Sequence, residues 1–369
     1  MTRPDGDIRA LTADYERWLG ERIPLVGEDL RFKHTEMTNS VLRFLRGTYY
    51  LWLWRVAHLL PELLDRPQVP CVGDLHIENF GTWRDHHGTR RWGVNDLDEL
   101  AWGGYPLDLV RLVTSAVLTP HVALSTKDLC RIVLAEWRAA EPGPAVKLDS
   151  PTAANLRDLL PAPTPVAHLI ASLTSVPQTD PHRVPAVVRA AASHTVEPGW
   201  APTWYPRRAG TGSLGHPRIA AVGRDHCGHW SVREVKLLGP ATTTWLHGRV
   251  EAGPGEHFPI VDDLLYGRVV TTLRGPEPSR RVQGWQIRRL APDVTRIELS
   301  QQRSPDTQRR MVRSMARAVA QVHGVDPARL AAARADSATL RDDWLREAVD
   351  VMVADIRHCH DQWRRQPVS

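Results

Sequence analysis

The stretch VGDLHIENF at residues 72–80 decides how this chain is interpreted. It places Asp74 and Asn79 five residues apart, directly after a short apolar run. Transfer of a phosphoryl group to a hydroxyl needs a carboxylate that accepts the hydroxyl proton and oxygen ligands that hold magnesium. An aspartate followed five residues later by an asparagine supplies both from one loop in protein kinases. Because this spacing also occurs by chance, the interpretation depends on the rest of the sequence.

A predicted β-hairpin follows this loop and leads to two further aspartates. The extended runs FGTWR and RRWGVND flank DHHGT, in which Gly88 suits a tight turn. The hairpin ends at VNDLDEL, where Asp96 and Asp98 lie on one side of an extended stretch. In the kinase pattern, a hairpin after the catalytic loop likewise ends at a metal-binding aspartate. We therefore predict Asn79 and Asp96 as magnesium ligands and Asp98 as a further candidate, with a solvated acidic turn as the alternative.

A glycine-rich stretch and a single strand lysine occur much later in the chain. GTGSLG at residues 210–215 matches GxGxxG, but Pro217 and the following RIAAVG predict a strand instead of the helix of a dinucleotide fold. In kinases a glycine-rich loop covers the ATP phosphates and a strand lysine reaches them. Lys236 lies in the apolar strand SVREVKLLG, and an edge-strand lysine that reaches solvent is the alternative. The predicted nucleotide-binding residues are Gly210, Thr211, Gly212, Ser213, Gly215, Lys236 and Arg288, the last on a strand expected to form the hinge beside the adenine.

The hydrophobic pattern predicts helices around these motifs. One helix is expected over residues 39–60, one from Pro106 and one over 125–140, and the tail 307–363 is also expected to be helical. Asp108 on the second helix is expected to cap it or to hold the backbone of the 72–80 loop. Residues 142–206 are rich in proline and predict a connecting region with short helices at most. FPIVDDLLYGRVVTTLRG is expected to be helical and RVQGWQIRRL to be one strand.

The order of these parts differs from that of kinases, which begin with the glycine loop and the lysine. Here the catalytic loop comes first, so the sequence predicts an α+β, protein-kinase-like two-lobe fold that is circularly permuted. The expected lobes are a catalytic lobe over 1–200, a nucleotide-binding β lobe over 201–300, and C-terminal helices over 301–369 that pack on the catalytic lobe. If this order is right, Gly212 and Lys236 must lie over the loop that contains Asp74.

Composition narrows the class of protein. The chain has 369 residues and a net charge of +5, and it contains no run of about 18 apolar residues. Its charged N-terminus does not resemble a signal peptide, so a cytoplasmic protein without a membrane partner is expected. Its arginines are dispersed among acids, which argues against a nucleic-acid-binding surface. Four widely spaced cysteines are expected to be free thiols: Cys71, Cys130, Cys227 and Cys359.

The blocks GDLHIENFGTW, VNDLDEL and PLDLVRL resemble an uncharacterised bacterial family, domain of unknown function 2252. The resemblance is expected to extend from FKHTEMTNSVLRFLRG through GTGSLG and VREVK to ARAVAQVHG, which is most of the chain. That family is similar to aminoglycoside and other small-molecule phosphotransferases of the protein-kinase-like fold. The resemblance implies an ATP-dependent domain in which Asp74, Asn79, Asp96 and Lys236 occupy functional positions.

Two positions depart from the pattern that this resemblance implies. Val72 stands where phosphotransferases carry a loop histidine, so no histidine is expected to support the loop. Thr271 stands where the family has a glutamate, which leaves Asp262, Asp263, Glu234 or no acid as the partner of Lys236.

The sequence thus predicts a phosphotransferase that uses ATP and Mg²⁺. Asp74 is expected to act as the base, with Lys236 as the second catalytic residue, and the acceptor is a hydroxyl or nitrogen of a small molecule or peptide. The acceptor cleft is expected to be roofed by the proline-rich segment, and Arg46, His76 and Glu78 are weaker candidates for contacting the acceptor. The alternatives are a nucleotide-binding pseudokinase scaffold and a basic nucleic-acid-binding protein.

Overall fold

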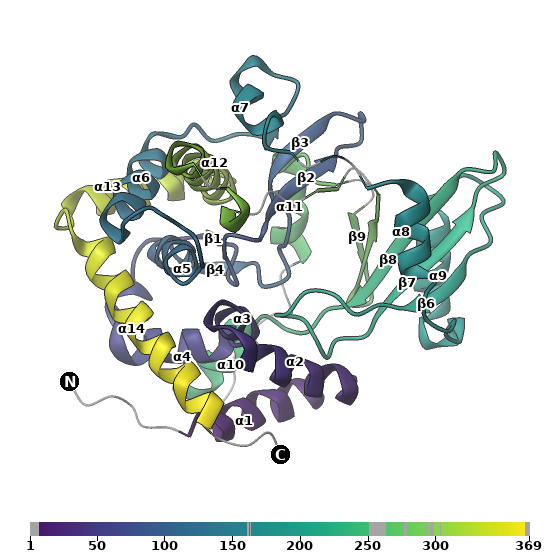
Figure 1. The fold of residues 1–369 in the computed structure, drawn as a ribbon, viewed down its shortest axis with the longest axis horizontal. Coiled ribbons are helices and arrows are strands. Elements are labelled where there is room, and N and C mark those ends of the chain that lie inside the picture. The colour runs from purple at the N-terminus through teal and green to yellow at the C-terminus, as the bar shows by residue number, and fades with distance from the viewer. Residues whose placement is uncertain are drawn as a thin grey trace.

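The computed structural model describes residues 7–160, 162, 164–250, 263–276, 279–291, 294–295, 299–302 and 304–365. In this part the chain is a mixed α and β protein with small antiparallel sheets. Most helices gather in one body, and a five-stranded sheet with its flanking helices forms a second body beside it (Figure 1). No helix of the described residues is both long and apolar enough to cross a membrane. All four cysteines are free thiols, as expected.

The helical body begins with four helices: α1 (Ile8–Gly20), α2 (Gly27–Asn39), α3 (Val41–Gly47) and α4 (Tyr49–Leu59). The prediction of one helix over residues 39–60 was wrong, because the chain breaks at Thr48 into α3 and α4. Thr48 has φ −129° and ψ 44°, and its hydroxyl donates to the carbonyl oxygen of Phe44 at 2.6 Å. The apolar spacing continues through this break because both helices bury their faces in the same core.

Four strands follow, and they position the 72–80 loop. β1 (Gln68–Cys71) pairs antiparallel with β4 (Ala101–Gly104). β2 (Phe80–Arg84) and β3 (Arg90–Val94) form the predicted hairpin, and the short β5 (Val146–Lys147) adds to β3. Gly88 in the turn has φ +73°, a backbone conformation that glycine adopts without strain. The 72–80 loop therefore joins two small sheets.

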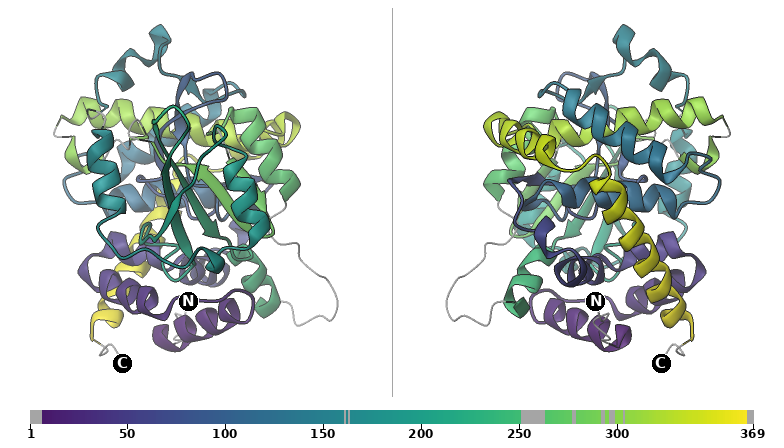
Figure 2. Two further views of the ribbon diagram at one scale, coloured as in Figure 1. Left: turned by 90° about the vertical axis from the view of Figure 1, so that its right-hand side faces the viewer. Right: turned by 90° about the vertical axis from the view of Figure 1, so that its left-hand side faces the viewer.

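The helices that follow these strands in the chain complete the helical body around them. α5 (Pro106–Val117) is buried along almost its whole length, and α6 (Thr126–Ala139) begins at Ser125, whose hydroxyl caps it. α12 (Pro305–His323) packs against α6, and α14 (Trp344–Arg365) packs against α5 and crosses that side of the molecule (Figure 2). α13 (Pro327–Thr339) joins them, so the expected helical tail consists of three helices.

The second body is an antiparallel sheet with strand order β6-β7-β8-β10-β9. The predicted single strand RVQGWQIRRL is instead a hairpin, because Gln283 and Gly284 both adopt positive φ between its two halves. A two-residue turn of this kind reverses the chain between paired strands. The strands are β6 (Thr203–Pro206), β7 (Arg218–Arg224), β8 (Trp230–Leu237), β9 (Ser279–Val282) and β10 (Trp285–Arg289).

Two helices of the proline-rich segment cover this sheet (Figure 2). α8 (Val166–Leu173) packs on the face that carries Ala220 and Val222, and α9 (Ala186–Ser193) packs on the face that carries Ile219 and Ala221. Alternate side chains of β7 thus enter different cores, as strand geometry requires. The boundary expected at residue 200, between the catalytic lobe and the nucleotide-binding lobe, therefore falls between α9 and the sheet that α9 covers. The remaining elements are η1 (Pro61–Leu63), η2 (Pro151–Ala153), α7 (Ala154–Arg157), η3 (Pro181–Arg183), α10 (Thr242–Val250), α11 (Asp263–Leu273) and η4 (Leu299–Gln301).

Candidate functional site

The predicted site residues meet in a cleft between the two bodies. The cleft is narrow, with a cavity volume of about 60 Å³. The described residues of the proline-rich segment do not line it, so the prediction that this segment roofs the cleft was wrong. The predicted residues that line it are Arg46, Asp74, His76, Glu78, Asn79, Asp96, Asp98, Gly210, Thr211, Gly212, Ser213 and Lys236.

A buried aspartate holds the backbone of the 72–80 loop. Asp108 is fully buried on α5 and accepts hydrogen bonds from the backbone N–H of Val72 at 2.7 Å and of Gly73 at 3.1 Å. Its carboxylate also bonds Nε2 of His323 at 3.0 Å, and Trp137 donates to the other ring nitrogen at 3.1 Å. The prediction that Asp108 holds the backbone of the 72–80 loop is confirmed. The prediction that no histidine supports the loop was wrong, because His323 on α12 bonds Asp108, which holds the loop.

Asp74 is held by Arg111, which lies on α5 as Asp108 does. Arg111 is buried, forms an ion pair with the Asp74 carboxylate, and donates to the carbonyl oxygen of Leu45 at 2.9 Å. Its guanidinium lies over the rings of Tyr49 and Trp52. Burial raises the pKa of Asp74, Arg111 opposes that shift, and the nearby Asp96 adds to it. The result is a held carboxylate whose proton affinity is greater than that of an exposed aspartate.

Asn79 stabilises the loop in addition to facing the cleft. Its side-chain oxygen accepts a hydrogen bond from the backbone N–H of His76 at 2.7 Å, and the residue is 5% exposed. The next backbone N–H, of Ile77, donates to the hydroxyl of Ser115 at 3.1 Å. A carbonyl oxygen has two lone pairs, so the Asn79 oxygen retains capacity for a second partner.

Lys236 is buried on β8, and its ammonium forms an ion pair with Asp98. Burial lowers the pKa of Lys236 to about 8, while the negative charge of Asp96 opposes this shift. Glu234 was one of the expected partners, but its carboxylate is surrounded by arginines that hold its pKa well below the usual range. Asp262 lies outside the described residues, and the side chain of Asp263 is likewise not described. The arginines around Glu234 are Arg207, Arg218 and Arg288.

The glycine-rich segment joins β6 to β7 and lies against Asp74. A Cβ atom at Gly212 would lie 2.7 Å from Oδ2 of Asp74, so this close approach requires glycine. Gly210 adopts φ +73° and Gly215 φ +101°. Nζ of Lys33 donates to the carbonyl oxygen of Gly212 at 3.2 Å and tethers the loop to α2. The expectation that Gly212 and Lys236 lie over the Asp74 loop is confirmed.

Two predicted nucleotide-binding residues lie outside the cleft lining. Gly215 packs against Leu30, where a Cβ atom would meet the leucine side chain at 2.5 Å. Arg288 bonds Glu234 at 2.7 Å and lines a separate small pocket with Tyr266 and Gln286.

The three weaker candidates form one cluster beside the loop. Arg46 forms an ion pair with Glu78, and its Nε donates to Nε2 of His76 at 3.2 Å. Arg46 therefore has a carboxylate partner in the cleft wall.

The sequence interpretation missed several residues that line the cleft. Glu99 accepts hydrogen bonds from the backbone N–H and the hydroxyl of Thr242 at 2.7 and 2.9 Å, and burial raises its pKa to about 7. Lys33 is 4% exposed, and His216 bonds the carbonyl oxygen of Leu237 at 3.0 Å. A signal for Lys33 existed in composition, because the chain has four lysines and two of them line this cleft.

The model of one protein family matches residues 25–139 and is described as an uncharacterized protein conserved in bacteria (DUF2252). The matched segment includes the 72–80 loop, Asp96, Asp98 and Asp108, and it ends before the glycine loop and Lys236. The resemblance to this family is confirmed over that segment. Neither a curated protein nor a solved structure matches the chain.

Proposed function

We propose that this chain is a phosphotransferase of the protein-kinase-like type that uses ATP and Mg²⁺ and phosphorylates a hydroxyl or nitrogen of a small molecule or peptide. One observation carries the proposal: the ion pair between Lys236 and Asp98 joins residues 138 positions apart, in the cleft where Gly212 meets Asp74. A strand lysine, a glycine loop and a carboxylate loop are the parts that phosphoryl transfer needs together.

The chain topology supports the same proposal. The glycine loop joins the first two strands of the five-stranded sheet, and Lys236 lies on the third strand in chain order. Protein kinases also carry their lysine on the third strand, after a glycine-rich loop. In this chain the loop of Asp74 and the β2–β3 hairpin precede that sheet, so the two lobes are in permuted order.

The residue types fit magnesium and a polyphosphate. Asn79, Asp96 and Asp98 offer the oxygen ligands that Mg²⁺ prefers, and Lys236 and the loop amides offer cationic and N–H donors for phosphate. Bound Mg·ATP would supply the phosphoryl group and neutralise charge that develops during transfer. The 60 Å³ opening is smaller than the roughly 300–1,000 Å³ of ligand pockets, so the glycine loop must move away from Asp74 to admit a nucleotide.

Asp74 is the residue we assign to the acceptor proton. Its carboxylate faces the cleft, and its raised pKa makes it a better proton acceptor than an exposed aspartate. Arg111 holds one carboxylate oxygen in place, and Asp108 fixes the backbone two residues earlier. We assign the pair between Lys236 and Asp98 to the role of the lysine–glutamate pair of kinases. A lysine without an acidic partner would favour a pseudokinase scaffold, and Asp98 supplies that partner.

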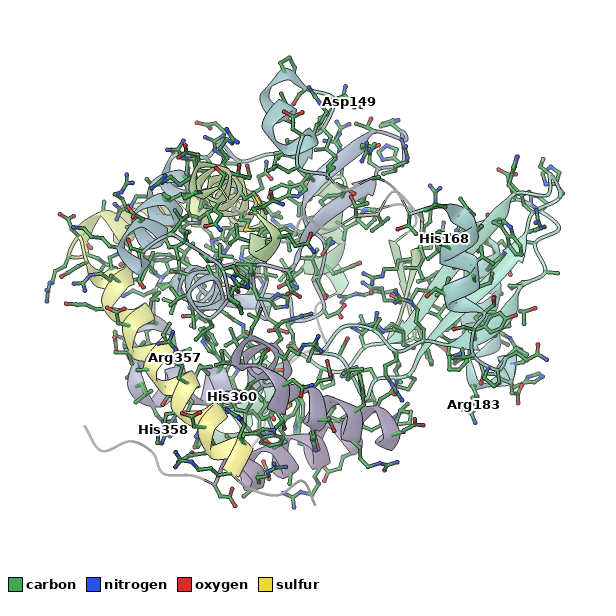
Figure 3. The ribbon with its side chains drawn as sticks, in the orientation of Figure 1. Asp149, His168, Arg183, Arg357, His358 and His360 are labelled. Atoms are coloured by element: carbon green, nitrogen blue, oxygen red, sulfur yellow. The ribbon has the colours of Figure 1, made fainter. Side chains whose placement is uncertain are left out.

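A transfer assay tests the proposal. The wild-type protein is incubated with Mg·ATP and a fractionated metabolite and peptide extract, and products are sought by mass spectrometry as a mass gain of one phosphate. We expect such a product with wild type and with Asp149→Asn, whose side chain lies at the outer tip beside α7 (Figure 3). Asp74→Asn should lower product by roughly 10²–10⁴-fold. Nucleotide binding without any product would instead favour the scaffold.

A further inference from the structure

A second pocket lies at the far end of the five-stranded sheet, away from the Asp74 cleft. It has a volume of about 740 Å³, which is within the range of small-molecule sites. α8 and Leu290 provide an apolar wall, and Trp230, which is 40% exposed, lies at the start of β8. Figure 1 shows this end of β8 beside α8.

Two arginines face each other across adjacent strands in this pocket. Arg233 on β8 and Arg289 on β10 are direct register partners, and both line the pocket. Like charges directly opposite each other destabilise a sheet. Arg280 on β9 also lines the pocket, so three strands each contribute one arginine.

Arg233 is buried without a described carboxylate partner. The residue is 6% exposed, and its guanidinium donates to the hydroxyl of Thr195 at 2.7 Å, to the carbonyl oxygen of Val232 at 3.0 Å, and to the carbonyl oxygen of Thr195. These acceptors are neutral, and they use three of its five N–H groups. Burial, together with the smaller effect of the positive charge on Arg289, lowers the pKa of Arg233 to about 10. A buried cation that lacks a counter-charge is costly unless something else supplies one.

The other charged residues that line the pocket do not neutralise its excess of positive charge. Glu197 is the one acid among the described lining residues, and it is exposed. Arg280 and Arg289 are exposed, and no described acid forms an ion pair with either of them. His86 and His194 also line the pocket, and Nδ1 of His194 bonds the carbonyl oxygen of Ala190 at 2.7 Å.

We propose that this pocket binds the phosphate group of a small anionic molecule. A phosphate dianion matches the excess charge better than a single carboxylate, and the planar fork of arginine suits two-point binding of phosphate oxygens. The pocket bends around the end of the sheet, because the strand register places Arg233, Arg280 and Arg289 on the face that α9 covers and Leu290 and Trp230 on the face that α8 covers. The pocket and the Asp74 cleft are separate, so this inference does not depend on the proposed phosphotransferase activity.

Titration calorimetry with inorganic phosphate tests the proposal on the full chain. We expect saturable binding of phosphate and of sulfate, and at least tenfold weaker binding of acetate at equal ionic strength. Arg289→Gln should weaken phosphate binding by at least tenfold, because it removes an exposed arginine that supports no other described contact. Arg131→Gln on the distant α6 is the charge-matched control and should bind as the wild type does.

Two further measurements decide between sites and ligand classes. Lys236→Met should retain the phosphate site that Arg289→Gln loses, because Lys236 lines the other cleft. Loss of binding in Lys236→Met together with normal binding in Arg289→Gln would place the phosphate in that cleft and overturn the proposal. The proposal is also wrong if phosphate fails to bind, or if a single-stranded oligonucleotide binds through Arg289 far more tightly than phosphate does.

Discussion

Replacing Asp98 with asparagine tests the buried ion pair at the centre of the cleft. Asp98→Asn keeps the size of the side chain but removes the negative charge beside the Lys236 ammonium. The Lys236 side chain is 3% exposed, and burial already lowers its pKa to about 8. Without the carboxylate this pKa should fall further, so we expect a neutral amine near pH 7 in the variant.

The protonation of Lys236 in the wild-type protein sets the size of the effect. A folded-state pKa of about 8 stabilises the native state, relative to a neutral amine, by about 1.4 kcal/mol at pH 7 and about 2.7 kcal/mol at pH 6. The same contribution falls to about 0.1 kcal/mol or less at pH 9. The unfolded lysine titrates identically in both proteins and cancels. The cost of Asp98→Asn is therefore present below pH 8 and is lost as pH rises through that value.

Urea denaturation at pH 6, 7, 8 and 9 measures this cost. Loss of a partly buried carboxylate adds an offset that stays constant over this range, so the change with pH is the quantity to compare. Lys236→Met and the double variant complete a thermodynamic cycle, in which Asp98→Asn should lose its pH dependence when Lys236 is absent. A cost that stays constant from pH 6 to 9, or that persists unchanged in the Lys236→Met background, would refute the reasoning.

Three further changes separate the roles of the cleft residues. Asp96→Asn should weaken magnesium-dependent nucleotide binding, whereas Asp74→Asn should retain binding and slow transfer. Nucleotide titration and single-turnover transfer would be measured on both variants, and exchanged effects would mean that the two roles are reversed. Gly212→Ala places a Cβ atom 2.7 Å from the Asp74 carboxylate, so trypsin should cleave the displaced loop at Arg208 faster than in the Gly248→Ala control, and equal rates would contradict the close contact. Asp108→Ala leaves two buried N–H groups and His323 without their acceptor, and it should lower the free energy of unfolding by about 3–5 kcal/mol; a cost below about 1 kcal/mol in urea denaturation would argue against the hydrogen bonds described.

Short-range rules explain why much of the fold could be predicted. The turn at Gly88 and the cap at Ser125 depend on neighbouring residues, and both elements appear where the pattern placed them. The break at Thr48 was missed because apolar spacing stays in phase through it. The turn at residues 283–284 was missed because it lies inside an otherwise continuous run of strand-forming residues.

The partners of the site residues depend on contacts between distant segments, which periodicity cannot reveal. Asp98 was expected as a metal candidate, but its pairing with Lys236 follows only from how β8 lies over the end of the β2–β3 hairpin. His323 on α12 bonds Asp108, Lys33 on α2 bonds the glycine loop, and nothing near either residue in the sequence marks that role. The clustering of acids and of glycines and the support of the 72–80 loop by Asp108 were visible in the sequence, whereas the contributions of His323 and Lys33 were not.

The most direct test of the proposed function is equilibrium binding of Mg·ATP to the cleft. Thermal unfolding would be followed at increasing ATP with Mg²⁺, with ATP alone and with Mg²⁺ alone, for the wild type, Lys236→Met and the exposed-lysine control Lys127→Met. Ligand that binds the native state raises the melting temperature with concentration. We predict a saturable rise that needs both ATP and Mg²⁺, is retained by Lys127→Met and is lost in Lys236→Met. No rise at millimolar Mg·ATP, or an equal rise in Lys236→Met, would contradict the assignment of this cleft to a nucleotide.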